Sequence, residues 1–454
     1  MRDFTREQSG KELAFFLLPM ICSGMFQQVY SLINTAVVGR YLSYDAVAVI
    51  GACQPYASMQ GFVCVGMTTG FGFYLFRCIG AGDAEIFGRG FCGALYLTGF
   101  LALLGIGLPF FPSFLMDLIH IPEKLRPDAA VYLFYLLLDS GFLSLKNLLF
   151  CTIQGMGDSR FPGILSMLGV VTHTMLSVFL IAGLKLGVGA SALAILINNA
   201  LLSVCLFVHL VSVSSDHLRL VSAMRIPGSI WLELLKNGLV KSGMMVVIGW
   251  GSMMIQREIN RLPEEIIAGD AYGDVINNFL MEPLCAYATA AGIITGQNEG
   301  KRNAKLIRRF NRHLFGRALF WCVGFLLLGF FSAPRILRIL AGAETPRPVI
   351  AAGVLLFRFC CIGYPGLCAL LIFRSALQSL GEYRIFPWLG ATEMAISMVL
   401  SRFVVDYGYR VVGFSYMLRW YVPGILALIW YRHALKQREE QWKMDEVREV
   451  SEGV

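Results

Sequence analysis

Charged residues are scarce in this sequence. Of its 454 residues, only 15% are Asp, Glu, Lys or Arg, whereas 56% are hydrophobic. A soluble domain carries about 25% charged residues, so this chain has too few charges to cover a surface that faces water. The scarcity argues against a soluble enzyme, a disordered chain or a nucleic-acid-binding protein. It predicts that a lipid bilayer is the main solvent of the protein.

Motifs of enzymes and metal sites are also missing. The chain contains no H-E-x-x-H, nucleophile elbow or Gly-rich dinucleotide loop. The segment 296–301 resembles a phosphate loop only superficially, because three residues rather than four separate its glycines. The twelve cysteines form no C-x-x-C, and most fall in apolar stretches. We therefore expect no enzyme, disulfide, metal or cofactor, and transport energy would have to come from an ion gradient.

What the sequence does contain is long runs without charge. Residues 46–76, 90–116, 161–184 and 186–215 hold no Asp, Glu, Lys or Arg. Each exceeds the roughly 20 residues that span a bilayer as a helix. The runs predict an all-α membrane protein with twelve transmembrane helices, at 13–38, 44–76, 90–112, 129–154, 161–184, 190–213, 232–256, 266–296, 314–334, 349–378, 384–405 and 411–433.

The positive charges indicate the orientation. The formal net charge is +8, and the densest basic segment is 301–312, with further Lys and Arg near both ends of the chain. With twelve helices, that segment and both termini fall on one side, which the positive-inside rule makes cytoplasmic. We therefore expect a multi-pass protein of the plasma membrane. Binding of RNA or anionic lipid is the alternative interpretation of this basic segment.

The chain also repeats itself. Residues 154–162, Gln-Gly-Met-Gly-Asp-Ser-Arg-Phe-Pro, are echoed at 378–387, Gln-Ser-Leu-Gly-Glu-Tyr-Arg-Ile-Phe-Pro, and three further matches occur in the same order with offsets of 219 to 224. The repeat predicts an N-lobe at 1–213, a cytoplasmic linker at 214–231, a C-lobe at 232–435 and a cytoplasmic tail at 436–454. Six helices per repeat predict two bundles related by parallel pseudo-twofold symmetry.

An ordered set of motifs resembles the multidrug and toxic compound extrusion (MATE) family, within the wider multidrug/oligosaccharidyl-lipid/polysaccharide exporter superfamily. The set comprises the segments 27–42, 66–70, 79–83, 154–160 and 187–192, with 296–300 as the second-half counterpart of 79–83. The resemblance implies antiport of amphiphilic, mostly cationic drugs or metabolites against H⁺ or Na⁺. It further implies small-molecule substrates, membrane lipids as surroundings, no nucleic acid and a monomer.

The chain departs from the family pattern in its first half. Asn34 stands where the family usually has Asp, and Ser177 falls near a second family Asp. Neither side chain can carry a proton as a carboxylate does. We still expect the polar residues of this region to line a substrate cavity, together with Asn278 of the second half: Gln27, Tyr30, Ser31, Asn34, Gln60, His173, Ser177, Asn198 and Asn278.

Ionisable residues inside spans concentrate in the second half, and such residues are functional candidates by default. Asp270, Asp274, Asn278 and Glu282 recur every four residues along one helix face. Asp270, near the end of its span, is interpreted as solvated. The candidates for ion coupling are Glu282, Asp274 and, in the first half, His173.

Two alternatives to an exporter stay open. A lipid-linked oligosaccharide flippase would use Arg358 and Arg374 to bind a pyrophosphate head group, unless these arginines pair with acids such as Glu282. A transporter-derived sensor or channel is the other alternative, because the usual first-half acids are missing. In the fourth span, Asp139 and Lys146 lie seven residues apart and are expected to pair.

Overall fold

The computed structural model describes residues 4–6, 10–41, 44–118, 121, 123–213, 226–342 and 345–451, and for 10, 29–41, 44–48, 118, 446 and 449–451 it describes the backbone alone. Among these residues every regular element is a helix and none is a strand. Helices satisfy their own backbone hydrogen bonds, which is what an apolar solvent requires. The expectation of an all-α membrane protein is confirmed.

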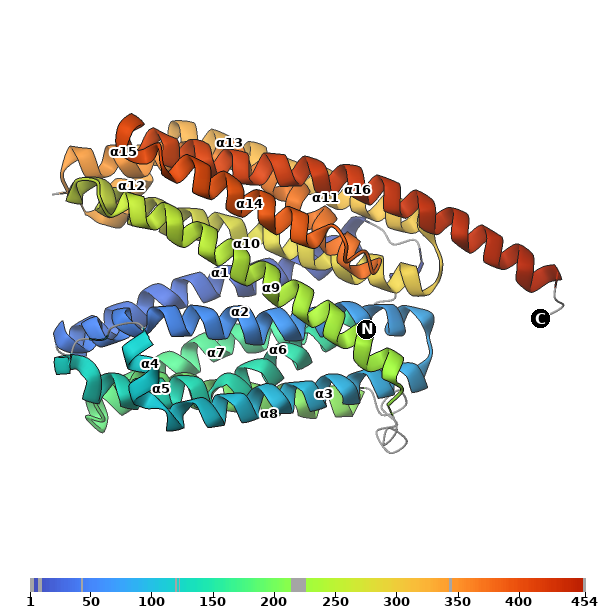
Figure 1. Cartoon of the computed structure of the whole chain (residues 1–454), viewed down its shortest axis with the longest axis horizontal. Helices are drawn as coiled ribbons and strands as arrows, with labels where there is room; N and C mark the ends of the chain where they lie inside the picture. The colour runs from blue at the N-terminus through green and yellow to red at the C-terminus, as the bar shows by residue number, and fades with distance from the viewer. Residues whose placement is uncertain are drawn as a thin grey trace. The chain divides into compact units, whose positions relative to one another are not determined.

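The chain divides into two compact units. The first unit contains the helices drawn from blue to green in Figure 1 and the first half of α9. In chain order its elements are α1 (Gly10–Tyr41), α2 (Tyr44–Ala81), α3 (Ala84–Gly107), η1 (Leu108–Phe110), α4 (Pro112–Leu118), η2 (Glu123–Leu125), α5 (Arg126–Leu138), α6 (Ser140–Gly155), α7 (Arg160–Val178), η3 (Phe179–Gly183) and α8 (Gly189–Val213).

The second unit contains residues 4–7 and everything from residue 244 onward. Its elements are the second half of α9 (Gly228–Ile259), then α10 (Glu264–Gly300), α11 (Ala304–Phe331), α12 (Ala333–Ala341), α13 (Arg347–Ser379), α14 (Phe386–Ser401), α15 (Val404–Tyr407) and α16 (Arg410–Ser451). The boundary between the units falls inside α9, whereas residues 214–225 of the predicted linker lie outside the described residues.

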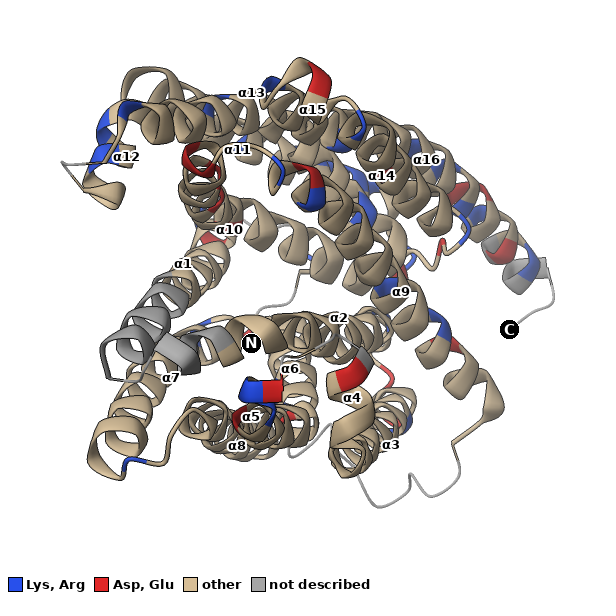
Figure 2. Cartoon of the chain, turned by 60° about the vertical axis from the view of Figure 1, so that its left-hand side comes forward, with Lys and Arg blue, Asp and Glu red and all other residues tan. Residues whose placement is uncertain are grey.

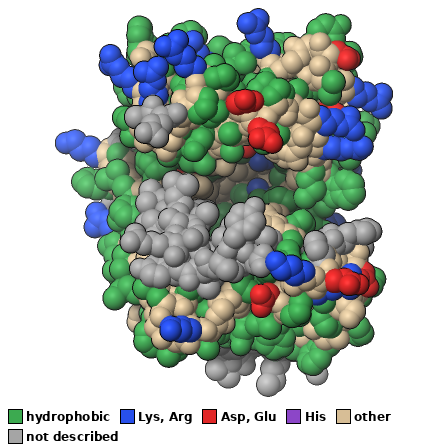
Figure 3. All heavy atoms as spheres, turned by 90° about the vertical axis from the view of Figure 1, so that its left-hand side faces the viewer, with side chains coloured by type: hydrophobic (Ala, Val, Ile, Leu, Met, Phe, Trp, Pro, Cys, Tyr) green, Lys and Arg blue, Asp and Glu red, His purple; other side chains and the backbone are tan. Residues whose placement is uncertain are grey.

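Each of the twelve predicted spans corresponds to a helix or a pair of consecutive helices. In the described part of the chain, ten segments are long and apolar enough to cross a membrane, and α1 and α14 correspond to the other two predicted spans. Large apolar side chains face outward on these helices, such as Phe110, Phe331 and Trp388, each at least 70% exposed. Figure 3 looks at the left-hand end of Figure 1, where hydrophobic side chains lie among charged ones. In water such exposure would be costly, whereas lipid tails accept it.

The first repeated motif folds into the same turn in both units. Segments 154–160 and 378–384 each end one helix and lead into the next. In each, the glycine adopts positive φ, 87° at Gly157 and 77° at Gly381. The amide of the following residue donates to the carbonyl five positions earlier, at 3.2 Å and 3.0 Å respectively. This is a Schellman cap, which needs a residue without a Cβ at the left-handed position.

The turns after α2 and α10 also correspond. Gly82 and Arg302 have φ of 76° and 53°, and the next residue caps the following helix. Asp83 accepts hydrogen bonds from two amides of α3 at 2.9 Å and 3.0 Å, and Asn303 accepts one from an amide of α11 at 3.1 Å. Short acceptor side chains are the preferred N-caps of helices, so the segment that resembled a phosphate loop ends in a helix cap.

The short segment around Phe4, which precedes α1, belongs to the second unit. Phe4 is fully buried, and its backbone is held on both sides by the end of α10. The Phe4 amide donates to Gln297 Oε1 at 3.1 Å, and Asn298 Nδ2 donates to the Phe4 carbonyl at 3.0 Å. The N-terminal segment therefore belongs to one unit while α1, which follows it, belongs to the other.

The motif Gly66-Met67-Thr68-Thr69-Gly70 is a close contact between two helices of the first unit. A Cβ added to Gly70 would lie 2.4 Å from the carbonyl oxygen of Asn237 in α9, and one added to Gly66 would lie 2.7 Å from Cα of Ser242. Small residues four apart allow backbones to approach in this way in membrane proteins. The glycines therefore set the separation of α2 and α9.

We predict that Gly70→Ala destabilises the protein by about 1–3 kcal/mol, because the added methyl group overpacks a contact with backbone atoms that cannot move aside. Gly61→Ala is the matched control in the same helix, since its Cβ would meet no atom within 4 Å. Thermal unfolding in detergent micelles, monitored by size-exclusion chromatography, measures the stability of both variants. Equal stability of the two variants would contradict the packing role of Gly70.

Candidate functional site

The fourth predicted span is broken in the middle. α5 ends at Leu138 and α6 begins at Ser140, and Asp139 lies between them. Gln60 of α2 donates from Nε2 to the carbonyl of Leu136 at 2.6 Å and to Oγ of Ser140 at 3.1 Å. Carbonyls near a helix end lack intrahelical donors. The buried Gln60, predicted to line a cavity, thus supplies a donor at this break.

Asp139 and Lys146 do not pair directly as expected, because an amide stands between them. Asn199 of α8 donates from Nδ2 to both carboxylate oxygens of Asp139, at 3.0 Å and 2.8 Å. Its Oδ1 accepts from Lys146 Nζ at 2.7 Å. The three side chains form a buried relay that ties α5, α6 and α8 together. The acid, the amide and the cation are linked by hydrogen bonds. The relay therefore stabilises the broken helix, and Asp139 is not a free carboxylate.

The other first-unit candidates are less closely grouped. His173 and Ser177 are both buried in α7, with Ser177 Oγ 3.2 Å from His173 Nδ1. Gln27 is exposed, and Asn198 is half-buried with an Oδ1 that meets no donor. The side chains of three further predicted cavity residues lie outside the described part: Tyr30, Ser31 and Asn34.

Acidic residues recur along α10 of the second unit (red in Figure 2), and two of them, Asp270 and Asp274, accept hydrogen bonds from tyrosines. Asp270 is only 4% exposed, so its interpretation as a solvated residue was wrong. Tyr409, just before α16, donates its hydroxyl to Asp270 in a short hydrogen bond. One turn further along, Tyr416 of α16 donates to Asp274 at 3.1 Å. The tyrosines were missed because nothing in their spacing singles them out from other membrane aromatics.

The same row of contacts continues along α10. Tyr364 of α13 donates to Asn277 Oδ1 at 3.2 Å, and both side chains are buried. Further along, Glu282 is half-buried and Asn278 is exposed. The predicted stripe therefore splits: its first acids point into the unit, toward α13 and α16, whereas Asn278 lies on its surface.

The buried arginines Arg374 and Arg419 of the second unit have partners within that unit. Arg374 of α13 is 3.4 Å from Glu393 of α14, and both are buried. Arg419 lies over the ring of Tyr416, 4.6 Å from its centroid, and donates to Ser397 at 3.4 Å.

Arg358 lies against the end of a neighbouring helix. It donates to the carbonyls of Gly329 and Phe330, at 3.5 Å and 3.3 Å. These carbonyls close α11 and lack intrahelical donors. Both Arg358 and Arg374 therefore have hydrogen-bond or ion-pair partners within the protein.

Comparison with known families now adds to this geometry. The MatE family model matches residues 19–179 and again residues 242–408, so the two matches begin 223 residues apart. The chain belongs to the MatE family. The double match also agrees with the internal repeat found in the sequence. As a member of a family of transporters, this MatE protein is not an enzyme.

Two curated relatives come from Bacillus subtilis (strain 168). The chain is 24% identical over 315 residues to the "Probable multidrug resistance protein YpnP", an alignment that covers 67% of this chain and 68% of the relative. It is 25% identical over 304 residues to the "Probable multidrug resistance protein YoeA", with 64% of each covered.

Solved structures share the fold. An outward-facing multidrug resistance MATE family transporter of the MOP superfamily superposes with a TM-score of 0.87 at 18% identity, over 96% of this chain and 98% of that one. A MOP superfamily transporter from Pyrococcus furiosus, described as having reverse polarity in its binding pocket, gives 0.86 at 17% identity over the same shares. At 17–18% sequence identity, this structural similarity establishes the fold of the MatE protein and no more.

We predict that Asn199→Ala destabilises the protein by about 1–3 kcal/mol or more, because it leaves the buried Asp139 and Lys146 without their bridging partner. The neighbouring Asn198→Ala is the matched control, since the Asn198 Oδ1 meets no donor. Thermal unfolding of both variants in micelles tests the relay. A larger loss in Asn198→Ala than in Asn199→Ala would be the opposite of the expected result.

Proposed function

We propose that this MatE protein exports amphiphilic, mostly cationic small molecules by alternating access, in exchange for H⁺ or Na⁺ and without a cofactor. The support is its membership of the family and the names of two relatives, both probable multidrug resistance proteins. The family resemblance further suggests a monomer of the plasma membrane, and the charge pattern supports an orientation with both termini cytoplasmic.

We further propose that ion coupling lies in the second unit. Asn34 and Ser177 offer no carboxylate in the first unit, and the first-unit acid Asp139 is engaged by Asn199. The second unit holds Asp274 in α10 with a tyrosine hydroxyl as donor. Arg419 lies over the ring of this tyrosine, but Asp274 forms no ion pair with it or with any other described residue. The carboxylate can therefore take up a proton or a cation without first breaking a salt bridge.

Glu282 is the companion candidate on the same helix. A structural ion pair with Arg374 or Arg358 would keep its carboxylate ionised. Arg374 instead pairs with Glu393, and Arg358 donates to helix-ending carbonyls. His173 is the remaining candidate, buried in α7 beside Ser177.

The positions of these arginines also bear on the flippase alternative. That alternative needs two cations available to a pyrophosphate, and burying a charge without its partner is expensive. Arg374 would have to leave Glu393, and Arg358 would have to leave the α11 carbonyls. We therefore favour export of an amphiphilic cation over transport of a lipid-linked sugar.

We predict that Asp274→Asn or Glu282→Gln reduces gradient-driven export to the rate of protein-free liposomes, because neither amide exchanges a proton or binds a cation as a carboxylate does. The assay uses full-length protein in liposomes with a fluorescent organic cation as substrate. A pH gradient and a Na⁺ gradient are imposed in separate experiments, which identifies the coupling ion.

The matched control is Asp406→Asn, which removes an exposed acid of the same unit. It should transport like the wild type. Undiminished, gradient-dependent export by both Asp274→Asn and Glu282→Gln would eliminate second-unit coupling and direct the test to His173→Gln. No export under either gradient by the wild type would overturn the antiporter proposal itself.

A further inference from the structure

One face of α11 is basic over its first half. Lys305, Arg308, Arg309, Arg312 and His313 are exposed, and Arg317 is half-buried on the same side. The residues between them, such as Leu306, Phe310 and Leu314, are buried in the second unit. Residues three and four apart lie on one helix face, so the cations form a single stripe about four turns long rather than a ring around the helix.

This stripe borders a hollow of about 700 Å³. The lining residues are Lys305, Arg308, Arg309, Arg312, His313, Gly316, Arg317 and Phe320. Gly316 lies in the stripe without a side chain, and a Cβ there would meet nothing within 4 Å. No side chain therefore covers the helix backbone at Gly316, which lies between the basic residues and Phe320.

Beyond Gly316 the same face becomes apolar. Phe320, Val323, Leu327 and Phe331 are 80%, 55%, 55% and 78% exposed, and their spacing of three and four residues continues the stripe. Counting back from Phe331 the roughly 20 residues that span the hydrocarbon core reaches Arg312. The basic part of the face thus begins at the depth where phosphate head groups lie, on the side that the positive-inside rule makes cytoplasmic.

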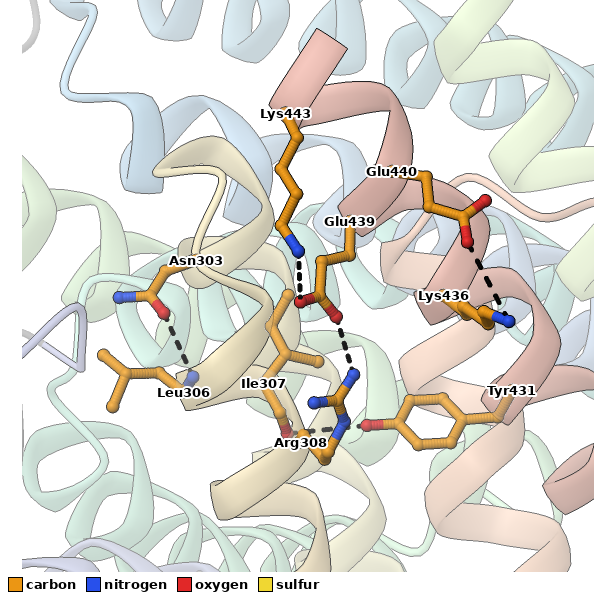
Figure 4. A network of polar contacts seen from close by, with 9 residues as sticks. All are labelled: Asn303, Leu306, Ile307, Arg308, Tyr431, Lys436, Glu439, Glu440 and Lys443. Carbon is orange, nitrogen blue, oxygen red and sulfur yellow. Dashed lines mark hydrogen bonds and ion pairs between the residues drawn. The ribbon is translucent and has the colours of Figure 1, made fainter. Parts of the chain in front are cut away.

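The cations of the stripe are not all committed to protein partners. Figure 4 shows Arg308 bound to Glu439 of α16, at 2.7 Å, with Lys443 on the other carboxylate oxygen. Lys305 and Arg312, seven residues apart on the stripe, form no ion pair within the described ranges of the chain. One cation is thus fixed against α16, while two others face the hollow.

We propose that this face of α11 binds an anionic phospholipid, with its phosphate between Lys305 and Arg312 above Gly316 and an acyl chain along Phe320 and Val323. A soluble anion would match the basic half alone, and a nucleic acid would gain nothing from the exposed apolar half. Only an amphiphile with an anionic head group and an apolar tail matches both halves, because the basic half of the α11 face comes first and the apolar half follows it. Basic clusters next to a membrane-spanning helix bind anionic head groups in this manner.

The test counts lipids bound to the intact protein. Full-length protein in detergent micelles is titrated with phosphatidylglycerol or phosphatidylcholine and examined by native mass spectrometry. We expect phosphatidylglycerol to bind at lower concentration, and Lys305→Gln/Arg312→Gln to weaken its binding by about 25-fold, because each cation at an anionic surface contributes about fivefold. Gly316→Leu keeps every charge but places a bulky side chain in the hollow, and should also weaken binding.

The matched control is Arg432→Gln/Lys436→Gln, which removes two exposed cations from α16. It should bind phosphatidylglycerol like the wild type. An equal loss of phosphatidylglycerol binding in both double variants would indicate a diffuse electrostatic attraction and would overturn the proposed site. Unchanged binding by Gly316→Leu would also overturn it. Full competition by inorganic phosphate at constant ionic strength, or tighter binding of a short RNA than of phosphatidylglycerol, would likewise overturn it. Monodispersity on size exclusion confirms that each variant is folded.

Discussion

An apolar solvent offers no hydrogen bonds, and this constraint determines where the polar side chains of the protein lie. The break after Leu138 would leave carbonyls without donors, and Gln60 supplies one. Asp139 would be a bare charge, and Asn199 connects it to Lys146. In each case the polar group is tolerated because a neighbouring helix provides its partner, so the hydrogen bonds also specify which helices pack together.

The two units meet this constraint by different chemistry. The first joins an acid to a cation through an amide, whereas in the second Asp270 and Asp274 accept hydrogen bonds from tyrosines, and Arg419 lies over one of those tyrosine rings. The amide of Asn199 donates to both carboxylate oxygens of Asp139, whereas Asp274 accepts one hydrogen bond from a hydroxyl. Asp274 is therefore the better candidate for a group that must change its occupancy during a transport cycle.

The sequence predicts the elements of this fold better than its contacts. Charge-free runs locate helices because the hydrocarbon thickness sets their length. Repeated glycines locate turns because the left-handed residue that ends a helix is usually glycine. The pairing of Tyr409 and Tyr416 with the acids of α10 crosses some 140 residues, and no local pattern encodes it. The break at Asp139 was likewise missed, because the apolar composition continues through it. Asp270 was placed in water because a position near a helix end does not reveal what packs over it.

The buried N-terminal segment has a consequence for biosynthesis. Phe4 leaves the ribosome well before its hydrogen-bonding partner Gln297, which follows 293 residues later. At about 5–20 residues per second, roughly 15–60 s of translation separate the two ends of this contact. The site for Phe4 therefore does not exist until α10 has been synthesised, by which time the first unit has entered the bilayer. Docking of the Phe4 segment is therefore a late step of assembly, and it joins an early part of the nascent chain to a helix that is synthesised much later.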